Sequence, residues 1–212
     1  MLSFPSKAEV NVKVPKKSFY ENLSVSTANK RIFIDQINAI YWRYKLTAES
    51  LSVAESDMID EIEVFEIELL TKDFDSAILR LIDKGIPYHT VFILTYNDEC
   101  QLWIAYKEKT SGDTLSVGSY YHTGFAPSES INLSAEGLSL NEVYANLFYA
   151  ISGLQKDCFL SLKDVITEYE KRQKLKKEIA RLEKQLRKET QPKKKFELHQ
   201  QIQKIKNEIM GE

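Results

Sequence analysis

The chain has 212 residues, of which 43% are hydrophobic, and a formal net charge of −2; this is enough for one or two domains with a sizeable core. The charge is uneven, because residues 163–212 hold 15 Lys and Arg against 9 Asp and Glu, whereas residues 1–162 hold 14 against 22. The chain has no run of 18 apolar residues, which excludes a membrane-spanning helix. Its two cysteines, Cys100 and Cys158, are too few for a disulfide framework. Because its start also lacks an apolar signal region, a cytoplasmic protein is predicted.

The first sixty residues contain one candidate strand and one candidate helix. Valines alternate with polar residues within 5–20, which predicts an edge strand or an extended arm. Ser26 or Thr27 is a suitable N-cap for a helix over about 27–45, whose apolar residues recur at helical spacing and are Phe33, Ile37, Ile40, Tyr41 and Tyr44. Residues 46–60 are polar and typical of turns.

Residues 61–70 carry the strongest strand pattern of the chain. Apolar side chains occupy both faces of a period-two alternation, and many are β-branched or aromatic. This favours a strand that is covered on both sides. One face carries Glu63, Phe65, Ile67 and Leu69, and the other carries Ile62, Val64, Glu66, Glu68 and Leu70.

A helix and two more strands follow. Asp73 is a candidate N-cap and Gly85 a candidate C-cap for the helix between them. The apolar run 91–94 predicts a buried strand, and 101–107 returns as a strand after a turn at Asn97-Asp98. The strand–helix–strand crossover should be right-handed with parallel strands, and the strand 101–107 should pair antiparallel with its predecessor.

A third hairpin strand and a covering helix complete the first part of the chain. Ser111-Gly112-Asp113 is a candidate turn, and the strand after it contains Leu115, Val117 and Tyr121. After a loop over 123–135, Ser139 and Glu142 have the spacing of a capping box. They precede an amphipathic helix that should cover the sheet, with apolar positions Val143, Leu147, Ile151 and Leu154.

The last fifty residues hold two apolar stripes at spacings of four, three and four residues. They are Leu175, Ile179, Leu182 and Leu186 in the first, and Leu198, Ile202, Ile205 and Ile209 in the second. Gln191-Pro192 separates them, and proline is poorly tolerated inside a helix. The simplest interpretation is a helical hairpin whose stripes face each other, and the second is a continuous helix that dimerises.

Together these elements predict an α/β fold over residues 1–160. It has a mixed sheet, built from a βαβ unit and β-hairpins, with flanking helices. A basic C-terminal helical hairpin or coiled coil follows over residues 161–212.

Two carboxylates are the main candidates for catalysis that the pattern offers, since Cys100 and His89 are better explained as a core thiol and an isolated histidine. Glu66 and Glu68 share one strand face, and Lys107 is predicted on a neighbouring strand. Converging carboxylates with a lysine could hold Mg²⁺ or Mn²⁺ in a nuclease, whereas the alternative is that both glutamates are solvated or paired with Lys or Arg. No zinc motif, phosphate-binding loop or dinucleotide fingerprint occurs, so no other cofactor is expected.

Two groups of residues suggest nucleic-acid binding. Trp42 lies beside Arg43 and Lys45, and aromatic side chains beside cations can stack on bases and contact phosphates. Lys193, Lys194 and Lys195 form a short basic run. The simpler interpretations are that the aromatic side chains face the core and that the lysines lie in a solvated turn.

Several segments resemble a bacterial family, the domain-of-unknown-function family 4391. They are Ile32–Leu46, Glu61–Leu69, Ile82–Leu94, Ala105-Tyr106-Lys107 and the tail around Phe196-Glu197-Leu198. The resemblance covers nearly the whole chain. It implies a genomic context, because members are often encoded beside DNA methyltransferases and helicases of restriction or phage-defence type.

The sequence therefore favours a non-catalytic accessory protein over an enzyme. Its expected partner is a protein of DNA modification, restriction or phage defence, such as a methyltransferase or helicase, with no membrane involved. The hairpin is expected to dock through Ile179, Leu182, Leu186, Leu198, Ile202 and Ile205. The metal-dependent nuclease, nucleic-acid binding by the basic tail and homo-oligomer formation are the alternatives.

Overall fold

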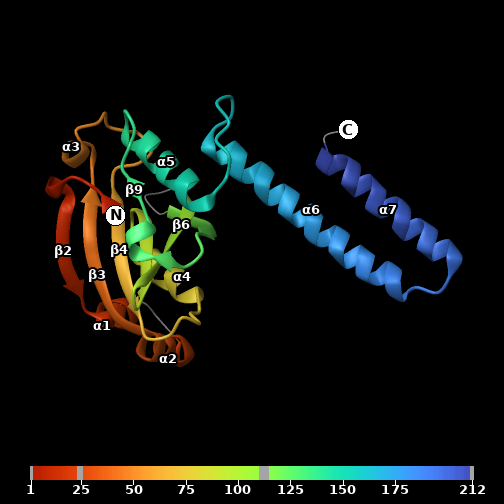
Figure 1. The fold of residues 1–212 in the computed structure, drawn as a ribbon, viewed down its shortest axis with the longest axis horizontal. Coiled ribbons are helices and arrows are strands. Elements are labelled where there is room, and N and C mark those ends of the chain that lie inside the picture. Colours follow the sequence, from red (N-terminus) through yellow and green to blue (C-terminus); the bar gives the residue numbers. More distant parts are fainter. Residues whose placement is uncertain (1, 23–25, 110–114, 211–212) are drawn as a thin grey trace. The chain divides into compact units, whose positions relative to one another are not determined.

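A computed structural model describes residues 2–22, 26–109 and 115–210 (Figure 1). The chain divides into two compact units, Met1–Gln155 and Lys156–Glu212. The first is a mixed α/β unit, and the second contains a pair of helices in contact. The predicted fold class is therefore confirmed.

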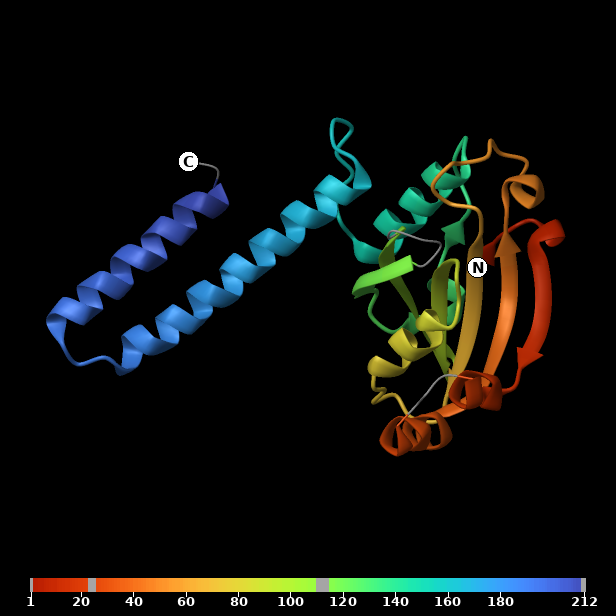
Figure 2. The ribbon, with the colours of Figure 1, turned by 180° about the vertical axis from the view of Figure 1, so that it is seen from behind.

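The first unit is built on one mixed sheet (Figures 1 and 2). All neighbouring pairs are antiparallel except β4 and β5, which are parallel. The two-residue strand β8 (Ala126–Pro127) pairs with β6. In spatial order the other strands are β2 (Glu9–Val14), β3 (Ile37–Leu46), β4 (Ile62–Leu69), β5 (His89–Tyr96), β6 (Glu99–Lys109) and β7 (Leu115–His122).

The sequence pattern correctly predicts this central arrangement. β4 and β5 are parallel on either side of a crossover helix, and β6 returns antiparallel to β5 after the turn at Asn97-Asp98. The valine-rich segment forms the edge strand β2. β7 is present as expected, while the predicted turn at 111–113 lies outside the described residues.

Helices α4 (Ala77–Lys84) and α5 (Leu140–Ser152) cover opposite faces of the sheet. Ile82 of α4 lies in one buried cluster with Phe65 and Phe92. Tyr144 of α5 packs edge-on against His89, with 4.5 Å between ring centroids. Positions 89 and 92 of one strand point to opposite faces. Both faces of β4 are therefore covered, as its two-sided apolar pattern predicts.

The helix predicted over 27–45 is wrong in its second half. Helix α2 (Thr27–Gln36) begins as expected, with the Ser26 hydroxyl accepting the Asn29 N–H. It ends where β3 begins, because residues 37–46 are dominated by β-branched and aromatic side chains that favour a strand. β3 also pairs along both of its edges, with β2 and β4, which satisfies its backbone groups.

Other helix boundaries also differ from the sequence expectations. α4 begins after Ser76 rather than at Asp73, and the Asp75 carboxylate accepts the Ala77 N–H. The Ser139 hydroxyl caps α5, but Glu142 accepts from Leu138 rather than closing the capping box on Ser139. α5 stops at Gly153, whose positive φ of 68° favours glycine, so Leu154 lies beyond it.

The remaining elements of the first unit are short. A parallel two-residue pair joins β1 to β9. Their bounds are β1 (Leu2–Ser3), β9 (Leu133–Ser134), α1 (Lys16–Asn22), α3 (Ala48–Leu51) and the 3-10 turns Ser6–Ala8 and Ser128–Ser130.

The second unit is a helical hairpin of α6 (Leu162–Lys188) and α7 (Pro192–Met210). The two segments form a hairpin rather than one continuous helix, because the helix ends at Lys188 and a new one begins at Pro192. We call its two apolar stripes the seam: Leu175, Ile179, Leu182, Leu186, Leu198, Ile202, Ile205 and Ile209. Leu182 and Ile202 are buried, and the other six are half-buried. Ion pairs join Lys171 to Glu208 and Lys206 to Glu183.

Truncating β3 tests its place in the core. Ile40→Ala should lower the free energy of unfolding by about 2–5 kcal/mol, because it opens a cavity among buried side chains; Ile40 is fully buried. Urea denaturation of the full chain measures the loss. Ile34→Ala is the matched control, since Ile34 on α2 is 52% exposed and should cost far less. Equal losses would contradict this placement of β3.

Candidate functional site

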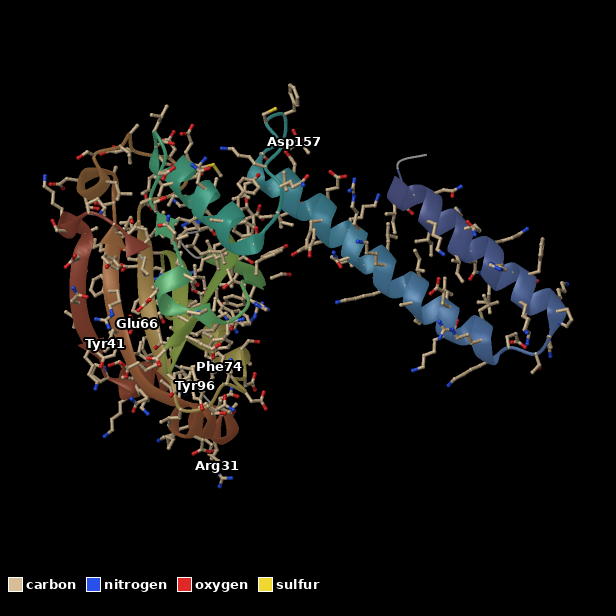
Figure 3. All side chains as sticks on the ribbon, in the orientation of Figure 1. Arg31, Tyr41, Glu66, Phe74, Tyr96 and Asp157 are labelled. Carbon is tan, nitrogen blue, oxygen red and sulfur yellow. The ribbon has the colours of Figure 1, made fainter. Side chains whose placement is uncertain are left out.

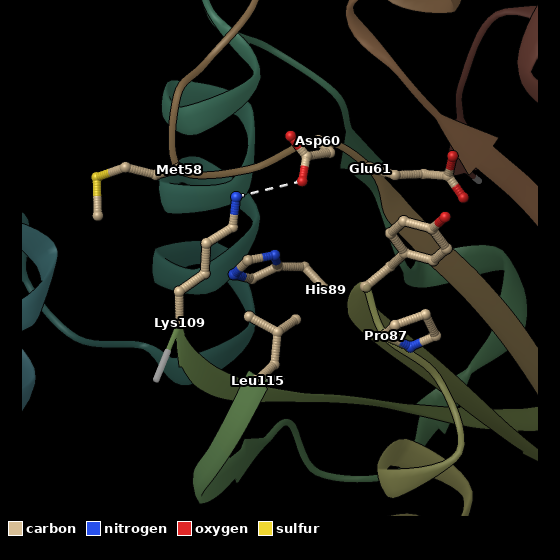
Figure 4. A pocket seen from close by; sticks show the side chains of 8 residues that line it. Met58, Asp60, Glu61, Pro87, His89, Lys109 and Leu115 are labelled. Carbon is tan, nitrogen blue, oxygen red and sulfur yellow. Dashed lines mark hydrogen bonds and ion pairs between the residues drawn. The ribbon is translucent and has the colours of Figure 1, made fainter. Parts of the chain in front are cut away.

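A cavity of about 220 Å³ lies at one end of the sheet (Figure 4). Because β4 and β5 are parallel, both begin at this end, where the antiparallel β6 finishes and β7 starts. The chain thereby brings together side chains from four separate segments. The lining residues are Met58, Asp60, Glu61, Pro87, Tyr88, His89, Lys109 and Leu115.

His89 is the buried imidazole of this cavity. Burial, followed by the positive charge of Lys107, lowers its pKa to about 4, so the ring is neutral at neutral pH. A ring nitrogen hydrogen-bonds to the Lys107 backbone. Because a neutral imidazole has one donor and one acceptor nitrogen, a ring that donates to this backbone keeps an acceptor on its other nitrogen. Lys109 and Asp60 form an exposed ion pair of 3.3 Å beside it (Figure 4).

Glu61 and Glu63 form a hydrogen-bonded acidic pair next to the cavity. Both are buried, and Lys45 Nζ lies 2.5 Å from Glu61 Oε2. Burial, then the hydrogen bond and charge of Glu61, raise the pKa of Glu63 to about 9, so Glu63 is protonated at neutral pH. Its Oε2 is a buried oxygen for which the described residues supply no hydrogen-bond partner.

The cavity lining therefore presents the neutral imidazole of His89 and the carboxyl group of Glu61, which is hydrogen-bonded to Glu63 outside the lining. Two carboxyl groups in contact share a proton because both cannot ionise cheaply at short range. This chemistry suits a small polar molecule that donates hydrogen bonds to Glu61 and His89. Within the part of the chain that the structure describes, no group of three or more His, Cys, Asp or Glu is suited to a metal ion.

A second buried network lies on the α4 face of the sheet. Lys107 Nζ is 2.6 Å from Asp83 Oδ1, and both side chains are fully buried. Lys107 also donates to the Tyr88 carbonyl, while Thr90 and Tyr120 donate hydroxyl hydrogen bonds to Asp83. Burial lowers the pKa of Lys107, and burial together with the Asp83 charge raises that of Tyr120. The network joins α4 to β5, β6 and β7.

The structure does not bring Lys107 to the two predicted carboxylates. Glu66 receives two hydrogen bonds from Arg43, of 2.9 and 3.0 Å, and Glu68 accepts one of 3.0 Å from Asn38. In register, Glu66 lies opposite Tyr41, and Figure 3 labels both on neighbouring strands. Glu66 points to the face of α5, whereas Lys107 pairs with Asp83 on the face of α4.

The residues predicted to bind nucleic acid either make contacts within the first unit or lie in the second unit. Trp42 stacks on Phe65, with 6.4 Å between centroids. Its neighbours in β3 are engaged with acids: Arg43 with Glu66 and Lys45 with Glu61. Strand β3, which replaces the predicted helix here, has a bulge between Trp42 and Tyr44. Trp42 and Lys45 both interact with Glu63, whereas Arg43 reaches Glu66 on the opposite face of β4. Lys193, Lys194 and Lys195 are exposed on α7.

Sequence reasoning missed Glu61, Glu63 and Asp83 as interacting groups. The available signal was an acid on an otherwise apolar face: Glu63 shares its strand face with Phe65 and Ile67, and Asp83 follows the apolar residues of α4. A buried acid needs a partner or a proton. Which partner it takes depends on contacts between distant segments.

The match to known families covers residues 2–209 and is to the family described as "Domain of unknown function (DUF4391)". The chain belongs to this family. The resemblance found in the sequence is thereby confirmed. No curated protein and no solved structure matches the chain. None of the helices formed by the described residues has the length and apolar character needed to cross a membrane.

Replacing Glu63 tests the acidic pair through pH. In the unfolded chain Glu63 ionises near its ordinary pKa of 4.5, but in the fold it keeps its proton up to about 9. Its contribution to stability is complete below pH 4.5 and is lost as pH rises toward 9. Glu63→Gln stays neutral, so its stability should rise relative to wild type over this window in urea denaturation.

The exposed variant Glu55→Gln serves as control for this pH series. Its stability should follow the wild type at every pH, because it removes a charge without removing a buried group. Parallel pH curves for Glu63→Gln and wild type would show that Glu63 is ionised in the fold.

Breaking the buried ion pair should cost far more than breaking the exposed one. Asp83→Ala leaves the Lys107 ammonium buried without its counter-charge, so the free energy of unfolding should fall by about 3–5 kcal/mol. Asp60→Ala, which breaks the exposed pair with Lys109, should cost about 1 kcal/mol or less. Urea denaturation compares the two variants, and adding Lys107→Met to Asp83→Ala should recover part of the loss. A loss under about 1 kcal/mol for Asp83→Ala would refute the structural role of the network.

Proposed function

We propose that the protein is a non-catalytic accessory protein that docks on a protein partner through its helical hairpin. The observation that carries this proposal is the state of the seam, where six of eight apolar positions are only half-buried. Two antiparallel helices alone cannot surround an apolar stripe. A third helix laid along the hairpin would bury the remaining surface, at about 25 cal/mol per Å² of apolar area.

Charge indicates what kind of partner fits. Residues 163–212 carry 15 Lys and Arg against 9 Asp and Glu, and many of these cations are exposed along α6 and α7. Two such hairpins would repel each other at close range. The suitable partner is therefore a protein that presents an amphipathic helix with acidic residues flanking its apolar stripe.

The proposed setting is DNA modification, restriction or phage defence in the cytoplasm, with a methyltransferase or helicase as the partner. The support is the genomic context that the family resemblance implies, which is an association rather than a physical argument. The separation of Lys107 from Glu66 and Glu68 gives no support to the nuclease alternative. That alternative requires Mg²⁺- or Mn²⁺-dependent cleavage that Glu66→Gln abolishes.

Charged substitutions in the seam test the docking proposal. Ile179→Glu with Ile205→Glu should abolish co-purification of the full chain with the neighbouring methyltransferase or helicase, because both positions are half-buried in the seam. Circular dichroism should confirm that helix content is retained. Phe159→Glu is the matched control in the same unit, since Phe159 is 91% exposed outside both helices.

Two results would refute docking by the seam. One is retention of the partner by the seam variant at the wild-type level. The other is an equal loss of the partner by Phe159→Glu, which would show a general effect of added negative charge.

A further inference from the structure

The turn of the hairpin concentrates positive charge. We call Arg187, Lys188, Lys193, Lys194 and Lys195 the hairpin tip; all five side chains are exposed. Figure 1 shows the end of α6 and the start of α7 brought together by the connection at this turn. The run of three lysines therefore lies at the same end of the hairpin as Arg187 and Lys188.

The tip has little internal compensation. Glu189 is the single acid within 187–196, and its carboxylate accepts the N–H groups of Thr190 and Gln191 at 2.8 and 2.9 Å. None of the five cations forms an ion pair with another described residue. The backbone N–H groups of Gln191 and Thr190, and then the charges of Lys194 and Lys195, lower the pKa of Glu189. One acid against five cations still leaves a net charge of +4 at the tip.

Helix stability does not account for the three lysines. Cations are favourable near the C-terminus of a helix and unfavourable near its N-terminus. Arg187 and Lys188 lie in the last turn of α6, as the dipole prefers. Lys193, Lys194 and Lys195 lie in the first turn of α7, which contains no acid. Their placement opposes the dipole, so an external anion is the better explanation of their presence.

An exposed aromatic ring adjoins these cations. Phe196 follows the three lysines and is 64% exposed, so it lies off the seam. Cations that contact phosphates beside an aromatic ring that stacks on a base are the usual combination for single-stranded nucleic acid. An anionic membrane surface would engage the same cations, but a single exposed ring offers little apolar area for insertion.

We propose that the hairpin tip binds single-stranded nucleic acid, with its five cations on the phosphates and Phe196 stacked on a base. Phosphate contacts carry no sequence information, so binding should be independent of sequence. The tip and the seam are different surfaces, since Leu186 and Leu198 mark the ends of the seam nearest the turn. This function is therefore additional to docking and stands independently of it.

Salt dependence of binding is the direct test. A fluorescently labelled oligothymidine and the full chain are mixed, and anisotropy gives the affinity at several salt concentrations. Five phosphate contacts on a single strand predict a log–log slope of about −3.5. The affinity should therefore fall roughly hundredfold between about 50 and 200 mM salt.

Charge reversal at the tip should weaken binding at least tenfold and flatten the salt slope. The variant carries Lys193→Glu, Lys194→Glu and Lys195→Glu, and its helix should stay intact because acids suit the first turn. The matched control reverses the same number of charges elsewhere on α6: Lys174→Glu, Lys177→Glu and Lys184→Glu, all exposed. Phe196→Ala should lower the affinity about tenfold, by loss of base stacking, and leave the slope unchanged.

Three outcomes would overturn the proposal. The first is a tip variant that binds the oligonucleotide as tightly as wild type, and the second is a control variant that loses as much affinity as the tip variant. The third is binding to anionic lipid vesicles without binding to the oligonucleotide, which would assign the tip to a membrane surface. Seam variants should leave oligonucleotide binding intact, so failure of docking and failure of this inference are separable.

Discussion

The first unit depends on one constraint: strand β4 is buried on both faces and hydrogen-bonded to a neighbouring strand along both edges. Its antiparallel neighbour β3 and parallel neighbour β5 satisfy its backbone groups, and α4 and α5 cover opposite sides of the sheet. A parallel neighbour requires a crossover connection, which α4 supplies. The same parallel pairing places the starts of β4 and β5 together, and the cavity forms at that end of the sheet.

The constraint also explains why three glutamates of one strand have different environments. Glu63, on the more enclosed face, keeps a proton and hydrogen-bonds to Glu61. Glu66 remains partly exposed and receives the Arg43 guanidinium, while Glu68 near the strand end accepts from an amide. A carboxylate in a covered strand needs protonation, a cation or hydrogen-bond donors. Which of these it takes depends on its depth and on the strand beside it.

The elements that sequence predicts well are those whose pattern is local. The strand, helix, strand and hairpin of 61–107 follow from alternation, caps and turn residues, and the tail hairpin follows from two stripes divided by Pro192. The helix over 27–45 fails because its aromatic and β-branched residues fit helical spacing and also favour a strand. Pairing with β2 and β4 decides between these, and that pairing is not encoded within the segment.

The candidate sites show the same division between local and long-range information. That Glu66 and Glu68 share a face is a local fact, and strand alternation gives it correctly. The pairing of Asp83 with Lys107 across 24 positions of sequence depends on the order of strands. The pairing of Arg43 with Glu66 depends also on a bulge in β3 between Trp42 and Tyr44. A period-two argument cannot pass through a bulge, because the extra residue changes which face the next side chain takes.

The placement of cations separates what the fold uses from what it leaves for other molecules. On and beside the strands, five cations are each paired with an acid: Arg43, Lys45, Lys72, Lys107 and Lys109. At the hairpin tip five cations lie within nine residues, three of them where the helix dipole opposes them. Such an arrangement costs stability in the isolated chain. An anion bound at the tip would offset this unfavourable interaction with the helix dipole. The cations beside the strands already have acidic partners, so in the described part of the chain the tip is where unpaired positive charge is available to an external anion.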